Sequence, residues 1–205
     1  MKIRNIYFTI VGVLVCGALL IGCGDKSESN MSGNEMQIEN TTETSQEQEN
    51  GQSQEEQQEP YILTFEAVTT EGEEITSDIF AQSKLTMINV WATYCNPCLK
   101  EMPALGEISE NYDTSEFRMI GIVSDVTEEA IDDVATAKSL IEETQANYPH
   151  LLLNESLYVN LVGAVEAVPT TFFINRQGEM LGYLVGSYDK QAWEEIIAEL
   201  LSECE

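Results

Sequence analysis

The sequence predicts an α/β fold in which a central mixed β-sheet carries helices on both faces. Short apolar runs of strand length alternate with longer runs whose apolar residues recur every three or four positions. Near the C-terminus, two strand-like runs follow each other directly before a last helical run. Alternation gives parallel strands joined by crossover helices, whereas a terminal hairpin adds antiparallel strands, so the combination predicts a mixed sheet.

The start of the chain predicts a lipoprotein signal peptide over residues 1–22. Lys2 and Arg4 form a positive beginning, and the mostly apolar run over 6–21 is shorter than the roughly 20 residues that a spanning helix needs. The run ends in L-I-G-C, which resembles a bacterial lipobox, so we expect Cys23 to be lipid-modified and to become the mature N-terminus. The alternative is an uncleaved N-terminal anchor, and both interpretations place the remaining chain outside the cytoplasmic membrane.

Residues 23–59 predict a disordered acidic tether. The segment consists almost entirely of Ser, Asn, Thr, Gln, Glu and Gly, with ten acidic residues against Lys26 alone. Such a chain cannot bury enough apolar surface to offset its ordering entropy, and its like charges extend it. We expect it to let a lipid-held domain reach partners above the membrane; the alternative is a leader without function.

The charge and the histidine count exclude two function classes. The chain has 36 acidic and 9 basic residues, a net charge of −27, so it lacks the basic surface that nucleic-acid binding requires. His150 is the only histidine, which excludes a metal site with several histidine ligands within one chain.

The folded domain is predicted to span residues 60–205 and to open with a β-hairpin. Residues 61–68 alternate loosely, 69–73 have the composition of a turn, and 74–76 form a return strand.

The centre of the domain is predicted to begin with a short helical turn through Ala81, capped by Ser77 or Asp78. A short run over 85–91, rich in Met, Ile, Val and Trp, predicts a buried strand. The helical spacing of apolar residues over 95–112 predicts a long helix directly after it.

A second strand over 117–123 and a helix over 128–146 follow, the helix capped by Asp125 or Thr127. A short strand is expected over 150–153. The apolar face of the helix would comprise Ala130, Ile131, Val134, Ala137, Leu140 and Ile141.

The C-terminal part is predicted to contain a short helix over 156–162 that Gly163 ends. Strands over 170–174 and 180–185 form a hairpin through a loop with glycine. Asp189 is expected to cap the last helix.

Two cysteines lie where the predicted 85–91 strand gives way to the helix. Cys95 and Cys98 are three positions apart, so on a helix their sulfurs share a face. The partial positive charge of a helix N-terminus stabilises a thiolate, and a thiolate with a resolving cysteine one turn later can carry out thiol–disulfide exchange. Half of a zinc site and a purely structural disulfide remain alternatives, although Cys23, Cys204 and His150 are at spacings unrelated to a four-ligand zinc site.

These motifs resemble the thioredoxin fold, and more narrowly its extracytoplasmic branch of TlpA-like and ResA-like thiol–disulfide oxidoreductases. W-A-x-x-C-x-P-C follows an apolar strand, and V-P-T precedes a strand–turn–strand–helix ending. The narrower resemblance rests on Asn89, on the K-E-M-P sequence that contains Glu101, on the insertion over 125–163 ahead of the proline-bearing strand, and on the lipid-anchored N-terminus. Tyr94 departs from the tryptophan that usually precedes the first cysteine, which implies a retuned partner groove.

The resemblance also implies roles for the site residues. Cys95, at the helix terminus, is expected to attack a disulfide, and Cys98 to resolve the mixed disulfide. Glu101 is expected to relay protons between the two thiols.

A second group of residues is expected to bind the partner. Pro169 is expected to be cis and, with Val168, to present backbone groups to an extended partner peptide. Trp91 and Tyr94 are expected to wall the site, with Trp91 as a core residue the alternative. No cofactor beyond the Cys95–Cys98 disulfide, and no metal, is expected.

We therefore expect a lipid-anchored protein-disulfide reductase at the extracytoplasmic face of a bacterial cell membrane. Expected substrates are oxidised extracytoplasmic proteins, for example apocytochrome c during cytochrome c maturation, or methionine sulfoxide reductases. A membrane thiol-transferring protein would supply the electrons. The alternatives are a disulfide-forming oxidant and a non-catalytic binding lipoprotein, such as a metallochaperone or peptide-capture module; a peroxidase is not expected, since no Thr-x-x-Cys sequence occurs at the dithiol.

Overall fold

The structure is a computed structural model that describes residues 60–204. The signal peptide predicted over 1–22, the tether predicted over 23–59 and the lipidation site Cys23 lie outside the described residues. Within 60–204, no helix has the length and apolar character needed to cross a membrane.

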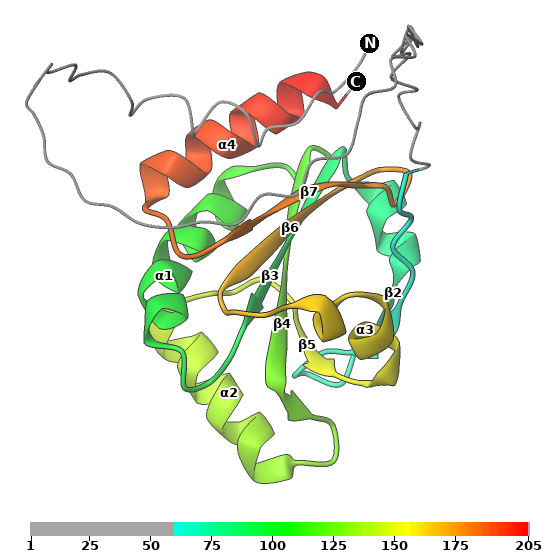
Figure 1. Ribbon diagram of the computed structural model, residues 1–205. Helices are drawn as coiled ribbons and strands as arrows, with labels where there is room; N and C mark the ends of the chain where they lie inside the picture. The colour runs from blue at the N-terminus through cyan, green and yellow to red at the C-terminus, as the bar shows by residue number, and fades with distance from the viewer. Residues whose placement is uncertain (1–59, 205) are drawn as a thin grey trace, which may run out of the picture. The chain divides into compact units, whose positions relative to one another are not determined.

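A five-stranded mixed sheet forms the centre of the domain, with the strand order β5-β4-β3-β6-β7 (Figure 1). The central strand β3 (Leu85–Trp91) is buried along its whole length, as its unbroken apolar run predicts. It pairs in parallel with β4 (Phe117–Thr127) and antiparallel with β6 (Thr170–Asn175). The outer strands are β5 (His150–Leu153), parallel to β4, and β7 (Met180–Val185), antiparallel to β6. The mixed sheet is therefore confirmed.

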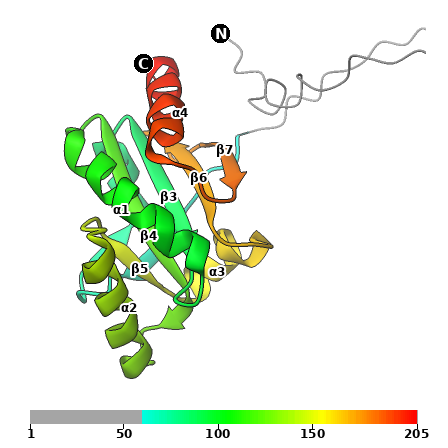
Figure 2. The same ribbon diagram turned by 90° about the vertical axis from the view of Figure 1, so that its left-hand side faces the viewer.

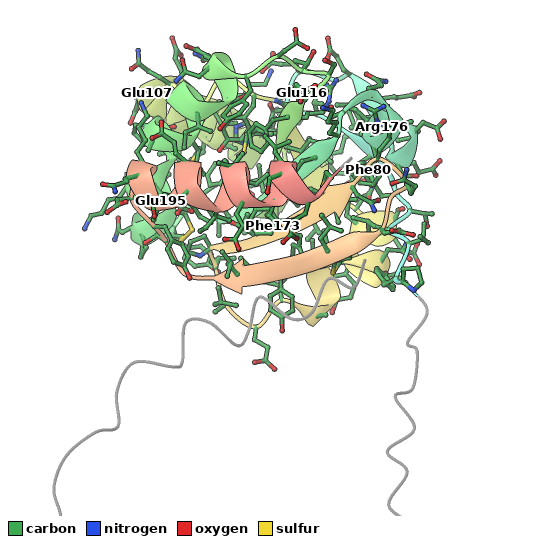
Figure 3. All side chains as sticks on the ribbon, turned by 90° about the horizontal axis from the view of Figure 1, so that it is seen from above. Phe80, Glu107, Glu116, Phe173, Arg176 and Glu195 are labelled. Atoms are coloured by element: carbon green, nitrogen blue, oxygen red, sulfur yellow. A yellow bond between two sulfur atoms is a disulfide. The ribbon has the colours of Figure 1, made fainter. Side chains whose placement is uncertain are left out.

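Helices cover both faces of this sheet (Figures 1 and 2). One face packs against α1 (Asn96–Asn111), α2 (Ile131–Thr144) and α4 (Lys190–Glu203), and this core includes the two cysteines. Figure 3 shows Phe173 of the sheet beside α4, while Glu107 and Glu195 point outward. These two acidic side chains thus lie on the solvated exterior of an apolar core.

The other face of the sheet carries shorter elements. The 3₁₀ helix η2 (Ser77–Gln82) and α3 (Glu155–Asn160) pack there, followed by the 3₁₀ turn η3 (Val162–Ala164). Gly163 lies inside η3, so the predicted helix over 156–162 ends earlier, at Asn160, and not at the glycine.

The N-terminal hairpin is confirmed, although its strands are short. β1 (Glu66–Val68) pairs antiparallel with β2 (Glu74–Thr76). The Thr69 hydroxyl accepts hydrogen bonds from the backbone N–H groups of Glu71 and Glu73, which fixes the turn.

The caps of two predicted helices were wrong. The short turn after β2 is capped by the side chain of Thr76, one residue before the predicted cap. The predicted start of α2 at 128 is also too early: β4 continues to Thr127 and α2 begins at Ile131 without a side-chain cap. Ile131, expected on the apolar face, is 78% exposed because it begins the helix beyond the edge of the core. By contrast, Asp189 caps α4 as predicted.

Helices α1 and α2 approach closely at Gly106, which yields a stability prediction. A Cβ atom at Gly106 would lie 2.3 Å from the backbone oxygen of Gln145, which cannot rotate away. We expect Gly106→Ala to destabilise the protein, since overpacking costs about 1–3 kcal/mol and outweighs a helix-propensity gain of up to about 1 kcal/mol. Gly182→Ala is the matched control, because nothing lies within 4 Å of its Cβ position. Equal denaturation midpoints for the two variants in urea would contradict this prediction.

Candidate active site

The two cysteines of the first turn of α1 form a disulfide. Their sulfurs are 2.03 Å apart and their Cα atoms 5.3 Å apart. Cys95 is 5% exposed and Cys98 is fully buried, so Cys95 presents the sulfur that a partner can reach. The structure thus confirms that the dithiol can close at the junction of β3 and α1.

The N-terminus of α1 is directed at the sulfur of Cys95. Cys95 is the N-cap residue, and the backbone N–H of Cys98 lies 3.3 Å from Cys95 Sγ. When the disulfide is reduced, this N–H and the helix dipole stabilise a thiolate at Cys95. Cys98 follows in the same turn but is fully buried, so a partner cannot reach its sulfur. The arrangement therefore selects Cys95 as the nucleophile.

The proline-bearing loop lies against the dithiol. The Val168–Pro169 peptide bond is cis, as predicted, and the carbonyl oxygen of Val168 lies 3.7 Å from Cys95 Sγ. Pro169 is buried, and its carbonyl accepts a hydrogen bond from the N–H of Gly186 at 2.8 Å. Val168 remains half-buried, so the loop presents backbone beside the reactive sulfur.

Glu101 lies one turn after Cys98 on α1 and is only 3% exposed. Its two carboxyl oxygens accept hydrogen bonds from Asn89 Nδ2 at 3.1 Å and from the backbone N–H of Tyr188 at 3.2 Å. Burial raises the pKa of Glu101 to about 7, against the smaller opposing effects of Tyr188, Asn89 and Trp193. Glu101 is therefore not an ordinary solvated helix glutamate, and it can gain or lose a proton near neutral pH.

Asn89 connects Glu101 to the proline-bearing strand. Its Nδ2 also donates to Thr171 Oγ1 at 3.0 Å, so one amide links α1, β3 and β6. Asn89 was identified from the sequence, but two distant residues were missed: Thr171, which accepts from Asn89 across 82 residues, and Tyr188, which donates to Glu101 across 87. The second threonine of V-P-T-T was the only local signal for Thr171.

The two aromatic residues expected to wall the site have different positions. Tyr94 precedes Cys95 in the chain and is 75% exposed, so its ring is accessible and its role as a wall of the site stays a prediction. Trp91 is fully buried, and its indole N–H donates to His150 Nδ1 at 3.1 Å. The expectation of a partner-binding Trp91 is corrected to the core alternative, because its side chain has no accessible surface for a partner.

His150 completes this buried network as a neutral ring. Its Nδ1 accepts from Trp91, and its Nε2 lies 3.0 Å from the carbonyl oxygen of Ala146, which fixes the proton on Nε2. Burial lowers the pKa of His150 to about 4. Among residues 60–204, no group of three or more His, Cys, Asp or Glu side chains could hold a metal ion, and the free Cys204 has no partner at the site.

The comparison with known families agrees with this geometry. A family model described as the AhpC/TSA family matches residues 61–181. The chain belongs to the AhpC/TSA family.

Curated relatives of this AhpC/TSA protein are thiol–disulfide enzymes. The thiol-disulfide oxidoreductase ResA of Bacillus thuringiensis subsp. konkukian (strain 97-27) is 25% identical over 136 residues, which cover 66% of this chain and 74% of the relative. The thiol:disulfide interchange protein DsbE of Pseudomonas fluorescens biotype C is 28% identical over 134 residues, which cover 65% and 70%.

Solved structures show the same fold. A thiol:disulfide interchange protein of the thioredoxin family from Chlorobium tepidum TLS has a TM-score of 0.57 at 23% identity, covering 70% of this chain and 97% of that one. The resemblance to ResA-like proteins of the thioredoxin superfamily is thus confirmed, and this AhpC/TSA protein is a thiol–disulfide oxidoreductase. A non-catalytic binding module does not account for the dithiol and these relatives.

The buried Glu101 predicts a specific pH dependence of stability. Its pKa is raised in the folded protein, so the folded state holds a proton that the unfolded chain has released. The stabilisation is complete below the ordinary pKa of 4.5 and is lost as the pH rises through about 7. Between these limits we expect the oxidised wild type to lose up to about 3 kcal/mol more unfolding free energy than Glu101→Gln.

The free energies of unfolding of wild type and Glu101→Gln are compared over the whole pH range. A difference at one pH would also contain the loss of an acceptor for the Tyr188 N–H, which glutamine removes. His150 acts with the opposite sign, since its lowered pKa costs stability as the pH falls below 6.5, but it is common to both proteins. Parallel urea-denaturation profiles for wild type and variant from pH 4.5 to 8 would show that Glu101 does not titrate in this range.

Proposed function

We propose that this oxidoreductase reduces disulfides in proteins outside the cytoplasmic membrane. The buried Glu101 one turn after Cys98 is the observation that carries the direction of electron flow. A carboxylate near two thiols raises their pKa by charge repulsion, which opposes the extreme thiolate stabilisation of strong disulfide oxidants. A dithiol whose reduced form is less stabilised gives up its electrons more readily.

The reaction begins with the reduced dithiol. The Cys95 thiolate attacks one sulfur of the substrate disulfide, which forms a mixed disulfide and releases a substrate thiolate that takes up a proton. Glu101 then accepts the proton of Cys98, and the Cys98 thiolate attacks Cys95 Sγ. The second substrate sulfur leaves as a thiolate and is protonated, so the substrate gains two electrons and two protons. The Cys95–Cys98 disulfide of the present structure is the product state.

The proposed location rests on the N-terminal sequence. The L-I-G-C sequence supports a lipid on Cys23, and the polar segment over 23–59 supports a tether to the extracytoplasmic face of the membrane. One structural relative is titled a secreted Mycobacterium tuberculosis disulfide oxidoreductase homologous to E. coli DsbE, which agrees with this location.

The proposed partners follow from the direction of electron flow and from the location outside the cytoplasmic membrane. A protein outside the membrane cannot draw on cytoplasmic reductants directly, so a membrane thiol-transferring protein would recharge the dithiol. The substrates would be oxidised extracytoplasmic proteins, such as apocytochrome c awaiting haem or methionine sulfoxide reductases. The oxidant alternative requires a different redox potential: we expect a value closer to that of thioredoxin, about −270 mV, than to that of DsbA, about −120 mV.

Reduction of insulin provides the direct test of the dithiol mechanism. With dithiothreitol as electron source, we expect wild type to accelerate insulin reduction and Cys95→Ser to abolish the acceleration, because serine cannot form the mixed disulfide. Cys98→Ser should accumulate covalent complexes with disulfide-containing proteins on intact cells, and their identification names the substrates. Activity retained in Cys95→Ser would contradict the mechanism, and Cys204→Ser is the control because Cys204 is remote from the dithiol in the sequence and is not disulfide-bonded.

The exposed Tyr94 predicts an effect on partner binding. Because the ring is 75% exposed, Tyr94→Ala should change the free energy of unfolding by less than about 0.5 kcal/mol. If the ring contacts the substrate, KM for a protein substrate should rise several-fold while kcat changes little. Tyr158→Ala is a matched control, since Tyr158 is 57% exposed on α3, far along the chain from the dithiol. An unchanged KM in Tyr94→Ala would exclude this role.

A further inference from the structure

The two tryptophans of the domain are both fully buried but differ at their indole N–H groups. Trp91 Nε1 donates to His150 Nδ1 at 3.1 Å, whereas Trp193 Nε1 has no hydrogen-bond partner in the part of the chain that the structure describes. An unpaired buried donor is costly, since it has given up its bonds to water without replacement. The unpaired N–H of Trp193 therefore calls for an explanation.

Trp193 lies next to the groups that hold Glu101. It belongs to the first turn of α4, and its ring packs edge-on against Tyr188, with ring centroids 4.9 Å apart. The backbone N–H of the same Tyr188 donates to Glu101 at 3.2 Å. The indole N–H of Trp193 is close enough to the carboxyl to lower the pKa of Glu101, although it falls outside hydrogen-bond geometry.

We propose that the indole N–H of Trp193 is a reserve hydrogen-bond donor, which binds the Glu101 carboxylate when that group becomes negatively charged. The proposal rests on the proposed function, because thiol–disulfide exchange is the process that moves protons on and off Glu101. Trp193 would then be a positioning residue that sets the proton affinity of Glu101 without contacting the substrate.

The hydrogen-bonding capacity of the carboxyl group supports this assignment. Asn89 and the Tyr188 N–H already supply one donor to each oxygen. An ionised carboxylate can accept about four hydrogen bonds, and bonds to a charged acceptor are roughly twice as strong as neutral ones. A third donor therefore stabilises the ionised form more than the protonated one, which makes the Trp193 bond dependent on the charge of Glu101.

Other titratable and charged groups also lie around Glu101. Burial and, to a smaller extent, the charge of Glu101 raise the pKa of Tyr148, whose hydroxyl also lacks a hydrogen-bond partner within residues 60–204. His150 stacks on Tyr148, with ring centroids 4.5 Å apart, but both of its nitrogens already have partners. Cys95 and Cys98 approach along α1, and no ion pair within 60–204 includes Glu101. Tyr148 is thus the competing donor, and the test includes it.

The test follows the two indole N–H protons by NMR in the full oxidised chain as the pH is varied. Trp91→Phe assigns the signals without altering Trp193. We expect the Trp193 N–H to move downfield with a midpoint near pH 7, as a hydrogen bond to a carboxylate forms, and this movement to be absent in Glu101→Gln. The Trp91 signal is the internal control, because its acceptor His150 titrates near pH 4.

A variant then tests the effect on Glu101 itself. Trp193→Phe should raise the Glu101 midpoint by about one pH unit, a tenfold change in proton affinity, as one charged hydrogen bond is lost. The midpoint is measured from the pH profile of insulin reduction, while Tyr148→Phe should leave it unchanged. If Trp193→Phe does not fold, the wild-type indole signal still decides the question.

The possible outcomes separate this inference from the proposed function. A Trp193 signal that stays constant while insulin reduction titrates near pH 7 would overturn the reserve-donor role and leave the reductase intact. A shift of the midpoint in Tyr148→Phe but not in Trp193→Phe would overturn it in favour of Tyr148. A protein that does not reduce insulin while the Trp193 signal titrates with Glu101 would refute the reductase and retain the hydrogen bond.

Discussion

The burial of the Glu101 carboxyl is the constraint around which this site is built. Three segments supply its surroundings: α1 carries the residue itself, β3 contributes Asn89, and the connection between β7 and α4 contributes the N–H of Tyr188. The carboxyl group is only 3% exposed, and without these donors its burial in an apolar core would carry a large desolvation cost. The Asn89 amide also donates to Thr171 of β6, so the hydrogen bonds of Glu101 are continuous with a side-chain contact across the central sheet.

The surrounding core explains why the site can keep a fixed geometry. Trp91 ends the central strand directly before the dithiol turn, and its indole is held by His150 from the outer strand β5. Gly121 lies between them on β4, where any Cβ would collide with the His150 ring at 2.1 Å. Side-chain contacts therefore join β3, β4 and β5 close to the dithiol turn. The reactive groups extend from rigid elements, which favours precise positioning over adaptability.

Much of the fold and the chemistry could be predicted because the signals are local. The apolar run of β3 and the Cys95–Cys98 spacing each lie within about ten residues, and the predicted bounds of β3 and β7 agree with the structure. The wrong or missed predictions concern side chains that bind another group nearby and contacts between residues far apart in the chain. Asp125 or Thr127 was expected to cap α2, but α2 has no side-chain cap, and the Asp125 carboxylate accepts a hydrogen bond from the N–H of Thr93 instead. Tyr188 contributes through its backbone N–H, which every residue except proline possesses, so no residue type could have signalled it.

The limited opening at Cys95 has a consequence for the shape of acceptable partners. Only 5% of this residue is accessible, and it lies between the projecting ring of Tyr94 and the backbone of Val168. One sulfur attacks another along the axis of the disulfide bond, which requires a narrow line of approach. A compact, rigid partner would therefore contact Tyr94 or Val168 before its sulfur reached Cys95. The narrow access to Cys95 therefore places a steric requirement on any disulfide that reacts there: it has to be carried on a slender, protruding or unfolded stretch of chain.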